Sequence, residues 1–203
     1  EGSPPLGIDP EIDELVFFPL IYWPVTADMA RLSDQALAKV DGFMKSGGTI
    51  LFDTRDQQYA GIGASLGGST PERARLQNLL RRLDVPPLVP IPQKHILTRA
   101  FYLMQTWPGR WSGGRVWVER HQGGINDGVS SLVIGGHDWA AAWATDANGV
   151  PLAAVVPEGR RQRELAYRFG VNLVMYALTG NYKADQVHVP ALLERLGQRR
   201  QAL

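Results

Sequence analysis

A short apolar run in the sequence ends in a dense group of polar side chains. The stretch GGTILFDTRDQQ, residues 47–58, contains Asp53, Thr54, Arg55 and Asp56. Carboxylates can act as bases or metal ligands, and a guanidinium group can hold an anionic group. Ligands of open α/β sheets bind outside the carboxyl ends of the strands. We therefore predict a ligand-binding rim at these four residues.

Side-chain alternation along the TILFD stretch predicts how Asp53 is placed. Thr49, Leu51 and Asp53 share one face of a strand, and Ile50 and Phe52 share the other. Both apolar sets are expected under helices, as in parallel sheets. Asp53 should then reach the rim with little exposure, where an unpaired carboxylate is costly. We expect loop amides or a nearby arginine to donate hydrogen bonds to it.

The other sequence patterns for a nucleophile or a thiolate metal site do not predict a catalytic site. The segment GASLG, residues 63–67, matches the Gly-x-Ser-x-Gly pattern, but that pattern needs serine directly between a strand and a helix. Ser65 lies well past the predicted strand, so the segment is interpreted as a glycine-rich loop. The absence of cysteine excludes disulfides, thiolate metal sites and a cysteine nucleophile.

The four histidines show no metal-binding spacing. No two lie at i, i+2 or i, i+4, so no metal site is predicted, and a site assembled from distant His and carboxylate residues stays an alternative. His137 and Asp138 follow a pair of glycines after an apolar run, which could bring both to the rim of the sheet. The histidines are His95, His121, His137 and His188.

Three tryptophans are interleaved with glycine and arginine in TWPGRWSGGRVWVE. Trp107, Trp111 and Trp117 would offer flat faces to a sugar ring or to a partner's side chain if the loop is exposed. The alternative is that the loop folds back and the rings cover the core.

The first half of the chain is typical of a strand, a helix and a second strand. Residues 14–23 are apolar on both faces, although Pro19 interrupts them. A helix should begin after Ser33 as N-cap and end at Gly47. A strand over residues 49–54 completes a βαβ unit with a parallel pair of strands.

Further elements are predicted along the rest of the chain. Thr70 and Pro71 should open a helix, VPPLVPIP should be extended, and HILTRAFYLM is ambiguous between a short strand and a helical turn. RVWVE and SSLVIGG are expected as strands. A hairpin is expected around Asn148-Gly149, with a helix in WAAAW as the alternative. The last elements are a helix over residues 162–178 that Gly180 stops, and another beginning at Pro190.

Composition limits the function classes. Of the 203 residues, 44% are hydrophobic and 20% are charged, so the chain can bury a core. The net charge is +1, which predicts no strong electrostatic attraction to nucleic acid or to an acidic membrane. No apolar run is long enough to span a membrane, so direct membrane insertion by this segment is not expected. The stretch EGSPPLGIDP is typical of a linker. We expect a linker over residues 1–13 and a single domain over residues 14–203, within a longer parent chain.

Several long motifs resemble domain-of-unknown-function family 4159. They are ELVFFPLIYWP, GGTILFDTRD, HILTRAFYL, GGHDWAAAW and YRFGVNLVMYALTGNYK. The family is similar to the class I glutamine amidotransferase-like superfamily. That likeness implies a three-layer α/β fold with a mostly parallel, flavodoxin-like sheet. The superfamily usually has a strand and helix before residues 14–23, so either the sheet lacks that first strand or the strand lies outside these 203 residues.

The resemblance also implies where a catalytic site would lie. In true class I amidotransferases the nucleophilic cysteine sits on the turn after the equivalent strand, which falls near Asp53 and Thr54. Neither can replace a thiolate, and no His-x-Glu pair follows late in the chain, so the catalytic site is expected to be lost. A polar rim remains, and its candidate ligand-binding residues are Asp53, Thr54, Arg55, Asp56, Arg99, Tyr102, Asn126 and Asp138.

The leading hypothesis is a non-catalytic, amidotransferase-like domain of a larger bacterial envelope-associated protein. It would bind a partner or small ligand at the carboxyl rim, need no cofactor, and be tethered at the inner membrane through the parent chain. One alternative is a carboxylate- or metal-dependent hydrolase at the same rim. Another is binding of carbohydrate or peptidoglycan through the tryptophan-rich loop.

Overall fold

The fold is built on one five-stranded sheet with helices on both faces. The computed structural model describes residues 5–59, 69–120 and 130–200, with side chains as far as residue 179. The strand order is β1-β2-β5-β4-β3. The strands are β1 (Leu20–Pro24), β2 (Thr49–Asp53), β3 (Leu88–Pro90), β4 (Trp117–Glu119) and β5 (Leu132–Gly135).

The sheet is mixed, so the expectation of a mostly parallel sheet is wrong. The pairs β1–β2 and β2–β5 are parallel, whereas β3–β4 and β4–β5 are antiparallel. A parallel pair needs a crossover connection, usually a helix. The segment between β3 and β4 is rich in proline at its start and forms no helix longer than the three-residue 3-10 turn η3 (Ile96–Thr98), so the chain returns in the opposite direction.

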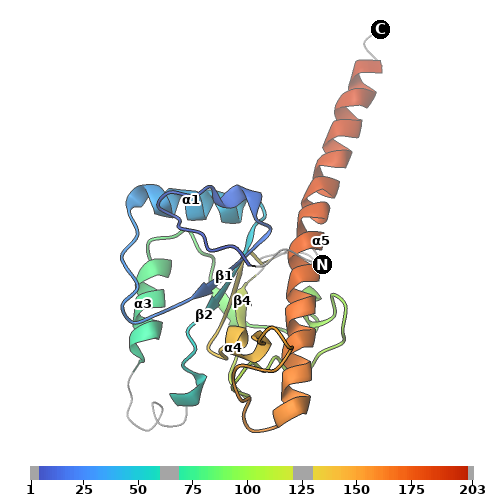
Figure 1. Cartoon of the computed structure of the whole chain (residues 1–203). Helices are drawn as coiled ribbons and strands as arrows, with labels where there is room; N and C mark the ends of the chain where they lie inside the picture. Colours follow the sequence, from blue (N-terminus) through green and yellow to red (C-terminus); the bar gives the residue numbers. More distant parts are fainter. Residues whose placement is uncertain (1–4, 60–68, 121–129, 201–203) are drawn as a thin grey trace.

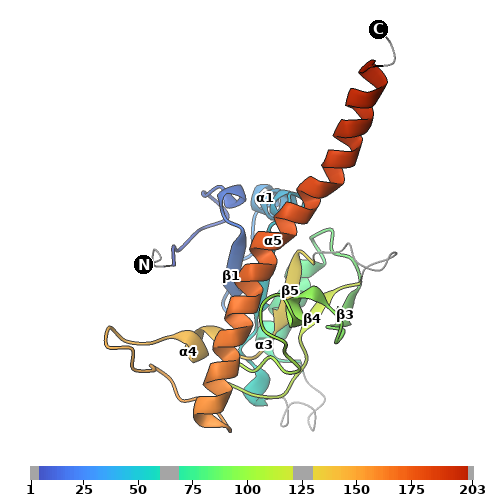
Figure 2. The same cartoon turned by 90° about the vertical axis from the view of Figure 1, so that its right-hand side faces the viewer.

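Helices cover the two faces and make three layers. Helices α1 (Asp34–Lys45) and α3 (Pro71–Leu80) pack on one face, where Ile50 and Phe52 contribute to their core. Helix α5 (Gly159–Arg200) covers the other face, where Leu51 belongs to its cluster. Figure 1 shows α1 and α3 on the side of the sheet away from α5, and Figure 2 shows α5 crossing in front of the strands.

The predicted helix ends are confirmed in α1 and α3. The Ser33 side chain accepts a hydrogen bond from the backbone N–H of Ala36, and Thr70 caps Arg73 in the same way. Gly47 has φ +92°, a left-handed conformation that glycine adopts without a Cβ penalty. These local signals place the loop before β2, and with it the start of the strand that carries Asp53.

The elements before β1 and after β5 differ from expectation. Residues 14–23 are not one strand, because the 3-10 turn η1 (Leu15–Phe17) precedes β1. Residues 5–19 contain no strand. After β5, WAAAW forms α4 (Trp139–Trp143) rather than half of a hairpin, and around the Asn148-Gly149 turn only Thr145 and Pro151 pair as an isolated bridge.

Helix α5 runs through both positions at which a break was expected. It continues past Gly180 and Pro190 to Arg200, so the prediction of two helices is wrong. A glycine inside a helix costs only about 1 kcal/mol relative to alanine, which a helix already propagating can absorb. In Figure 1 the carboxyl-terminal part of α5 extends beyond the other elements. None of the helices in the described part of the chain has the length and apolarity needed to cross a membrane.

Candidate functional site

Asp53 ends β2 and is completely buried. All five residues of this strand are buried, as the alternation of apolar side chains predicts for a strand covered on both faces. The 3-10 turn η2 (Gln57–Tyr59) follows the polar turn. The carboxyl ends of β2 and β5 lie side by side, with Asp53 opposite Gly135.

Four donors fill the acceptor positions of the Asp53 carboxylate. Oδ1 accepts from the backbone N–H of Arg55 at 3.0 Å and of Asp138 at 3.2 Å. Oδ2 accepts from the backbone N–H of Trp139 at 2.8 Å and from the Tyr22 hydroxyl at 3.0 Å. Two hydrogen bonds on each oxygen are the full capacity of a carboxylate. The expectation that loop amides satisfy Asp53 is confirmed.

Burial and hydrogen bonding shift the pKa of Asp53 in opposite directions. Loss of hydration raises the pKa of Asp53 to about 6, because burial outweighs the four hydrogen bonds that favour the charged form. The same burial, with the Asp53 charge beside it, raises the pKa of Tyr22, so the Tyr22 hydroxyl stays a donor at neutral pH. Asp53 is therefore fully partnered within the protein.

Asp53 holds two strained turns. Arg55 and Asp138 both have φ +55°, and they are the two non-glycine residues with positive φ in the described part of the chain. Such left-handed conformations cost roughly 1–2 kcal/mol for residues with a Cβ. Both residues donate their backbone N–H to the same Asp53 oxygen. The carboxylate thus stabilises the turn after β2 and the turn after β5.

Asp56 is a second buried carboxylate with its own partners. Its oxygens accept from the Thr54 hydroxyl at 2.6 Å and from the Thr70 hydroxyl at 2.7 Å, and Oδ2 lies 2.6 Å from Arg73 Nε. Only 1% of Asp56 is exposed. Because Thr70 and Arg73 belong to the start of α3, Asp56 connects the rim of the sheet to that helix.

Gly136 lets the two strand ends approach each other closely. A Cβ at this position would lie 2.4 Å from Asp56 Oδ1 and 3.0 Å from Thr54 Oγ1. No side chain could be accommodated there without moving the Asp56 carboxylate. The glycine pair after β5 is therefore a steric requirement of the rim.

His137 lies at the same edge as a buried, neutral ring. Its Nε2 is 2.6 Å from the carbonyl oxygen of Gly113, and the ring stacks on Trp139 with centroids 4.6 Å apart. A contact with a carbonyl requires a proton on Nε2, which leaves Nδ1 as a lone-pair acceptor. Nδ1 is buried without a partner. Burial lowers the pKa of His137 to about 4, so the ring is uncharged at neutral pH.

A pocket opens beside the rim between α3 and the β5–β4–β3 side of the sheet. Its volume is about 460 Å³. Its polar lining comes from Thr54, Gln57, Arg73, Gln77 and Arg115. Its apolar lining comes from Leu76, Leu80, Leu88, Trp117 and Ile134. We call this cavity the rim pocket.

The predicted site residues separate into three groups. Asp53, Thr54, Arg55, Asp56 and Asp138 gather at the rim, and Thr54 lines the rim pocket. The side chain of Asp138 lies 3.5 Å from Arg110, whose backbone N–H donates to the Asp138 carbonyl. Asn126, like His121 and Ser65, lies outside the described residues.

Arg99 and Tyr102 lie at another part of the fold. Arg99 donates to the Lys94 carbonyl, and the backbone of Tyr102 pairs with the Asn172 amide. Asn172 is ten residues beyond Gln162, which holds Gly109 near the rim. Ten helical residues span about 15 Å, so these two side chains do not join the rim.

The three tryptophans do not form one surface. Trp107 packs against the cluster under α5, and its carbonyl accepts from the Trp139 indole N–H at 3.2 Å. Trp117 packs against the cluster on the opposite face of the sheet. Trp111 pairs with Val156, and the Arg110 guanidinium lies 5.0 Å from its ring. Only Trp117 of the three lines the rim pocket.

Within residues 5–59, 69–120 and 130–179, no group of three His, Asp or Glu side chains is placed to hold a metal ion. The sequence patterns do not predict the partners that complete the rim. Tyr22 alternates with buried residues of β1, and Arg73 lies in the first turn of α3 after the Thr70-Pro71 start. An arginine just after a helix start was the one local signal available, since helix starts are often packed against strand ends in α/β folds.

The family model described as "Domain of unknown function (DUF4159)" matches residues 2–178, which is most of the chain. No curated protein matches the chain.

Proposed function

The chain belongs to the DUF4159 family of domains of unknown function, and from the geometry of its rim we propose that it is a non-catalytic domain that binds a small ligand in the rim pocket. The match confirms the family resemblance of the sequence motifs. The further likeness to flavodoxin-like, class I amidotransferase-like domains is part of this proposal, supported by a parallel β1–β2–β5 core with helices on both faces.

The observation that carries the proposal is the saturation of the Asp53 carboxylate. Asp53 stands where the superfamily resemblance places a nucleophile, but both of its oxygens accept two hydrogen bonds from the protein. A general base or nucleophile needs a free lone pair aimed at the substrate. Asp56 is likewise occupied by Thr54, Thr70 and Arg73. These contacts support a structural role for both carboxylates.

The lining of the rim pocket supports a small amphipathic ligand. Its apolar side includes the Trp117 ring and Leu80, and its polar side offers hydroxyl, amide and guanidinium groups from Thr54, Gln77 and Arg115. A volume of about 460 Å³ lies within the range of small-molecule sites. The ligand class is a molecule with an aromatic or aliphatic body and a hydrogen-bonding group at one end.

Binding can be tested with benzamide as a neutral amphipathic probe in ligand-observed saturation-transfer NMR. Gln77→Trp, on the exposed side of α3, should fill the pocket and abolish the transfer. Ala74→Trp adds the same side chain to an exposed position of α3 that does not line the pocket, and should leave it unchanged. No transfer in the wild type, or equal transfer in both variants, would contradict ligand binding at this pocket.

The absence of catalysis has its own test. Incubation with glutamine or p-nitrophenyl acetate should give no turnover above that of buffer. Hydrolysis that disappears in Asp53→Ala or Ser65→Ala would overturn the non-catalytic part of the proposal, whatever the NMR result.

The cellular setting is proposed from the family resemblance. The resemblance implies that such domains are typically carboxy-terminal parts of larger bacterial proteins, some with an amino-terminal membrane segment, so we propose that the parent chain tethers this domain at the inner membrane. Fractionation of cells that express the full parent chain should recover it with membranes. Recovery in the soluble fraction would contradict the tether.

A further inference from the structure

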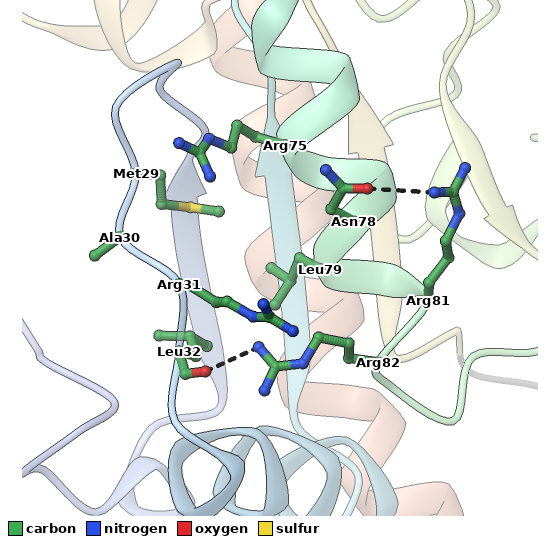
Figure 3. Close-up of a pocket in the computed structure, with 9 residues that line it drawn as sticks. All are labelled: Met29, Ala30, Arg31, Leu32, Arg75, Asn78, Leu79, Arg81 and Arg82. Carbon is green, nitrogen blue, oxygen red and sulfur yellow. Dashed lines mark hydrogen bonds between the residues drawn. The ribbon is translucent and has the colours of Figure 1, made fainter.

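A second cavity lies on the other side of α3 and is lined with arginine. It has a volume of about 380 Å³ and lies between the loop before α1 and the carboxyl-terminal half of α3 (Figure 3). Arg31 comes from the loop, Arg75 from the helix, and Arg81 and Arg82 from the residues that directly follow it. Met29 and Leu79 form part of its apolar wall. We call this cavity the arginine groove.

Two of the arginines are held in place by the protein. Arg82 donates from Nη1 to the Leu32 carbonyl at 2.8 Å and from Nη2 to Asp34 at 2.7 Å. Arg75 donates from Nε to the Ala27 carbonyl at 2.9 Å. These contacts order the guanidinium groups before any ligand arrives, which lowers the entropy cost of binding. Within the described part of the chain, the remaining N–H groups of each fork have no protein partner.

Positive charge exceeds negative charge around the arginine groove. None of its lining residues is acidic. Among the described residues, no carboxylate lies within 4.0 Å of a guanidinium nitrogen of Arg31, Arg75 or Arg81. Asp34, the partner of Arg82, is 98% exposed, so water screens that pair. The Arg81 guanidinium extends away from Arg31 and Arg82 (Figure 3) and, among the described residues, donates to the Asn78 side chain at 3.3 Å.

Figure 3 shows Arg31 and Arg82 extending toward each other across the groove, beside Leu79. Two guanidinium groups directed into one space repel each other unless an anion lies between them. Guanidinium forks match the oxygens of phosphate with paired hydrogen bonds. We propose that the arginine groove binds the phosphate group of a small molecule, between Arg31 and Arg82.

This site is separate from the rim pocket. Residues 75, 78, 79 and 82 face the arginine groove, whereas residues 73, 76, 77 and 80 face the rim pocket. At 100° per residue these two sets lie on opposite sides of the helix. The two cavities can therefore be altered independently. The groove proposal does not rest on the function proposed above.

The test is calorimetric titration of the protein with sodium pyrophosphate at low ionic strength. Arg31→Gln removes a groove charge that makes no backbone contact in the described part of the chain, and we expect at least a tenfold loss of affinity. Arg161→Gln removes the same charge from an exposed position in the first turn of α5 and should bind as the wild type does. Gln77→Trp, which fills the rim pocket, should also bind pyrophosphate normally.

A second arm distinguishes a free phosphate compound from a lipid headgroup. Vesicles of phosphatidylglycerol and of phosphatidylcholine are sedimented with the same variants. Pyrophosphate binding that depends on Arg31 supports a soluble ligand, and Arg31-dependent binding to phosphatidylglycerol vesicles alone supports a headgroup. Failure of both probes, or affinity unchanged in Arg31→Gln, would overturn the proposal. Loss of benzamide binding in Gln77→Trp bears only on the rim pocket.

Discussion

The Asp53 carboxylate lies 3.2 Å from the backbone nitrogen of Asp138, so a side chain at the end of β2 holds the backbone that follows β5. Asp138 has φ +55° at this point, and Trp139, which begins α4, donates to the other Asp53 oxygen. The buried Asp53 carboxylate thus stabilises the conformation of the turn at Asp138. This contribution can be measured as a change in the free energy of unfolding with substitution and with pH.

The first prediction concerns Asp53→Asn. The amide nitrogen cannot accept, so it leaves at least one buried backbone N–H unpaired, at a cost of about 1–3 kcal/mol. Burial raises the pKa of Asp53 to about 6, so its protonated form stabilises the fold below pH 4, and this stabilisation is lost as pH rises through 6. The variant has no such titration. The wild type therefore loses stability as pH rises, and the difference in unfolding free energy between wild type and Asp53→Asn should shrink by about 1.4 kcal/mol between pH 5 and pH 7.5.

Urea unfolding of both proteins at pH 5 and pH 7.5 measures this difference. A constant difference between wild type and Asp53→Asn across that range would contradict a raised pKa for Asp53. A variant as stable as the wild type at pH 7.5, where Asp53 is ionised, would contradict the four hydrogen bonds assigned to the carboxylate.

The second prediction concerns His137→Phe. Burial lowers the pKa of His137 to about 4, so protonation of the unfolded chain below pH 6.5 destabilises the wild type progressively as pH falls toward 4. Phenylalanine keeps a flat ring beside Trp139 but loses the contact with the Gly113 carbonyl, at a cost of about 1 kcal/mol. Phenylalanine does not titrate, so the unfolding free energy of the variant should rise by about 2.5 kcal/mol relative to that of the wild type as pH falls from 7.5 to 4.5.

Thermal melting at the two pH values tests the sign of this effect. His137→Phe should be less stable than the wild type at pH 7.5 and more stable at pH 4.5. Parallel pH profiles would show that the ring titrates normally in the folded protein.

The third prediction compares two glycines. Gly136→Ala places a methyl group 2.4 Å from Asp56 Oδ1, so the buried rim must shift, at a cost of about 1–3 kcal/mol. Gly42→Ala lies in α1 with no atom within 4 Å of the new Cβ, and should stabilise by up to about 1 kcal/mol. Denaturant midpoints of the two variants should therefore move in opposite directions. Equal shifts of the two midpoints would contradict the close contact between Gly136 and the Asp56 carboxylate.

The local parts of the fold could be predicted from sequence, because their signals are local. Ser33 and Gly47 mark the ends of α1, and alternation in TILFD places Asp53 at a buried strand end. The donors to Asp53 could not be named in the same way. Tyr22 is 31 residues away and Trp139 is 86 residues away, and no periodicity connects positions so distant.

The same limit explains the errors in the second half of the chain. The direction of β4 depends on pairing with β5 and β3, which no local pattern records. The Asn148-Gly149 turn was recognisable, but the segment before it is α4, since alanine favours helix more than strand. The prediction that Arg99 belongs to the rim is wrong, because the fold places this side chain against the Lys94 carbonyl.

The last prediction concerns Asn172, which joins α5 to the segment around η3. Its Oδ1 accepts from the backbone N–H groups of Phe101 and Tyr102, and its Nδ2 donates to the carbonyls of Leu97 and Tyr102 at 2.9 and 2.8 Å. The side chain is completely buried with every polar atom satisfied. Asn172→Asp would direct a carboxylate oxygen at two carbonyl oxygens.

Asn172→Asp should destabilise the fold at pH 7 by about 3 kcal/mol or more, because one oxygen of the buried carboxylate then faces two carbonyl acceptors. Protonation lets the new side chain donate one hydrogen bond, so the folded state should bind this proton more tightly than the unfolded chain does. The deficit should therefore decrease as pH falls from 7 toward 4. Asn148→Asp, in the exposed turn, should change stability by no more than about 0.5 kcal/mol. Denaturant unfolding across this pH range measures both variants, and a deficit in Asn172→Asp that does not depend on pH would contradict the acceptor-lined site.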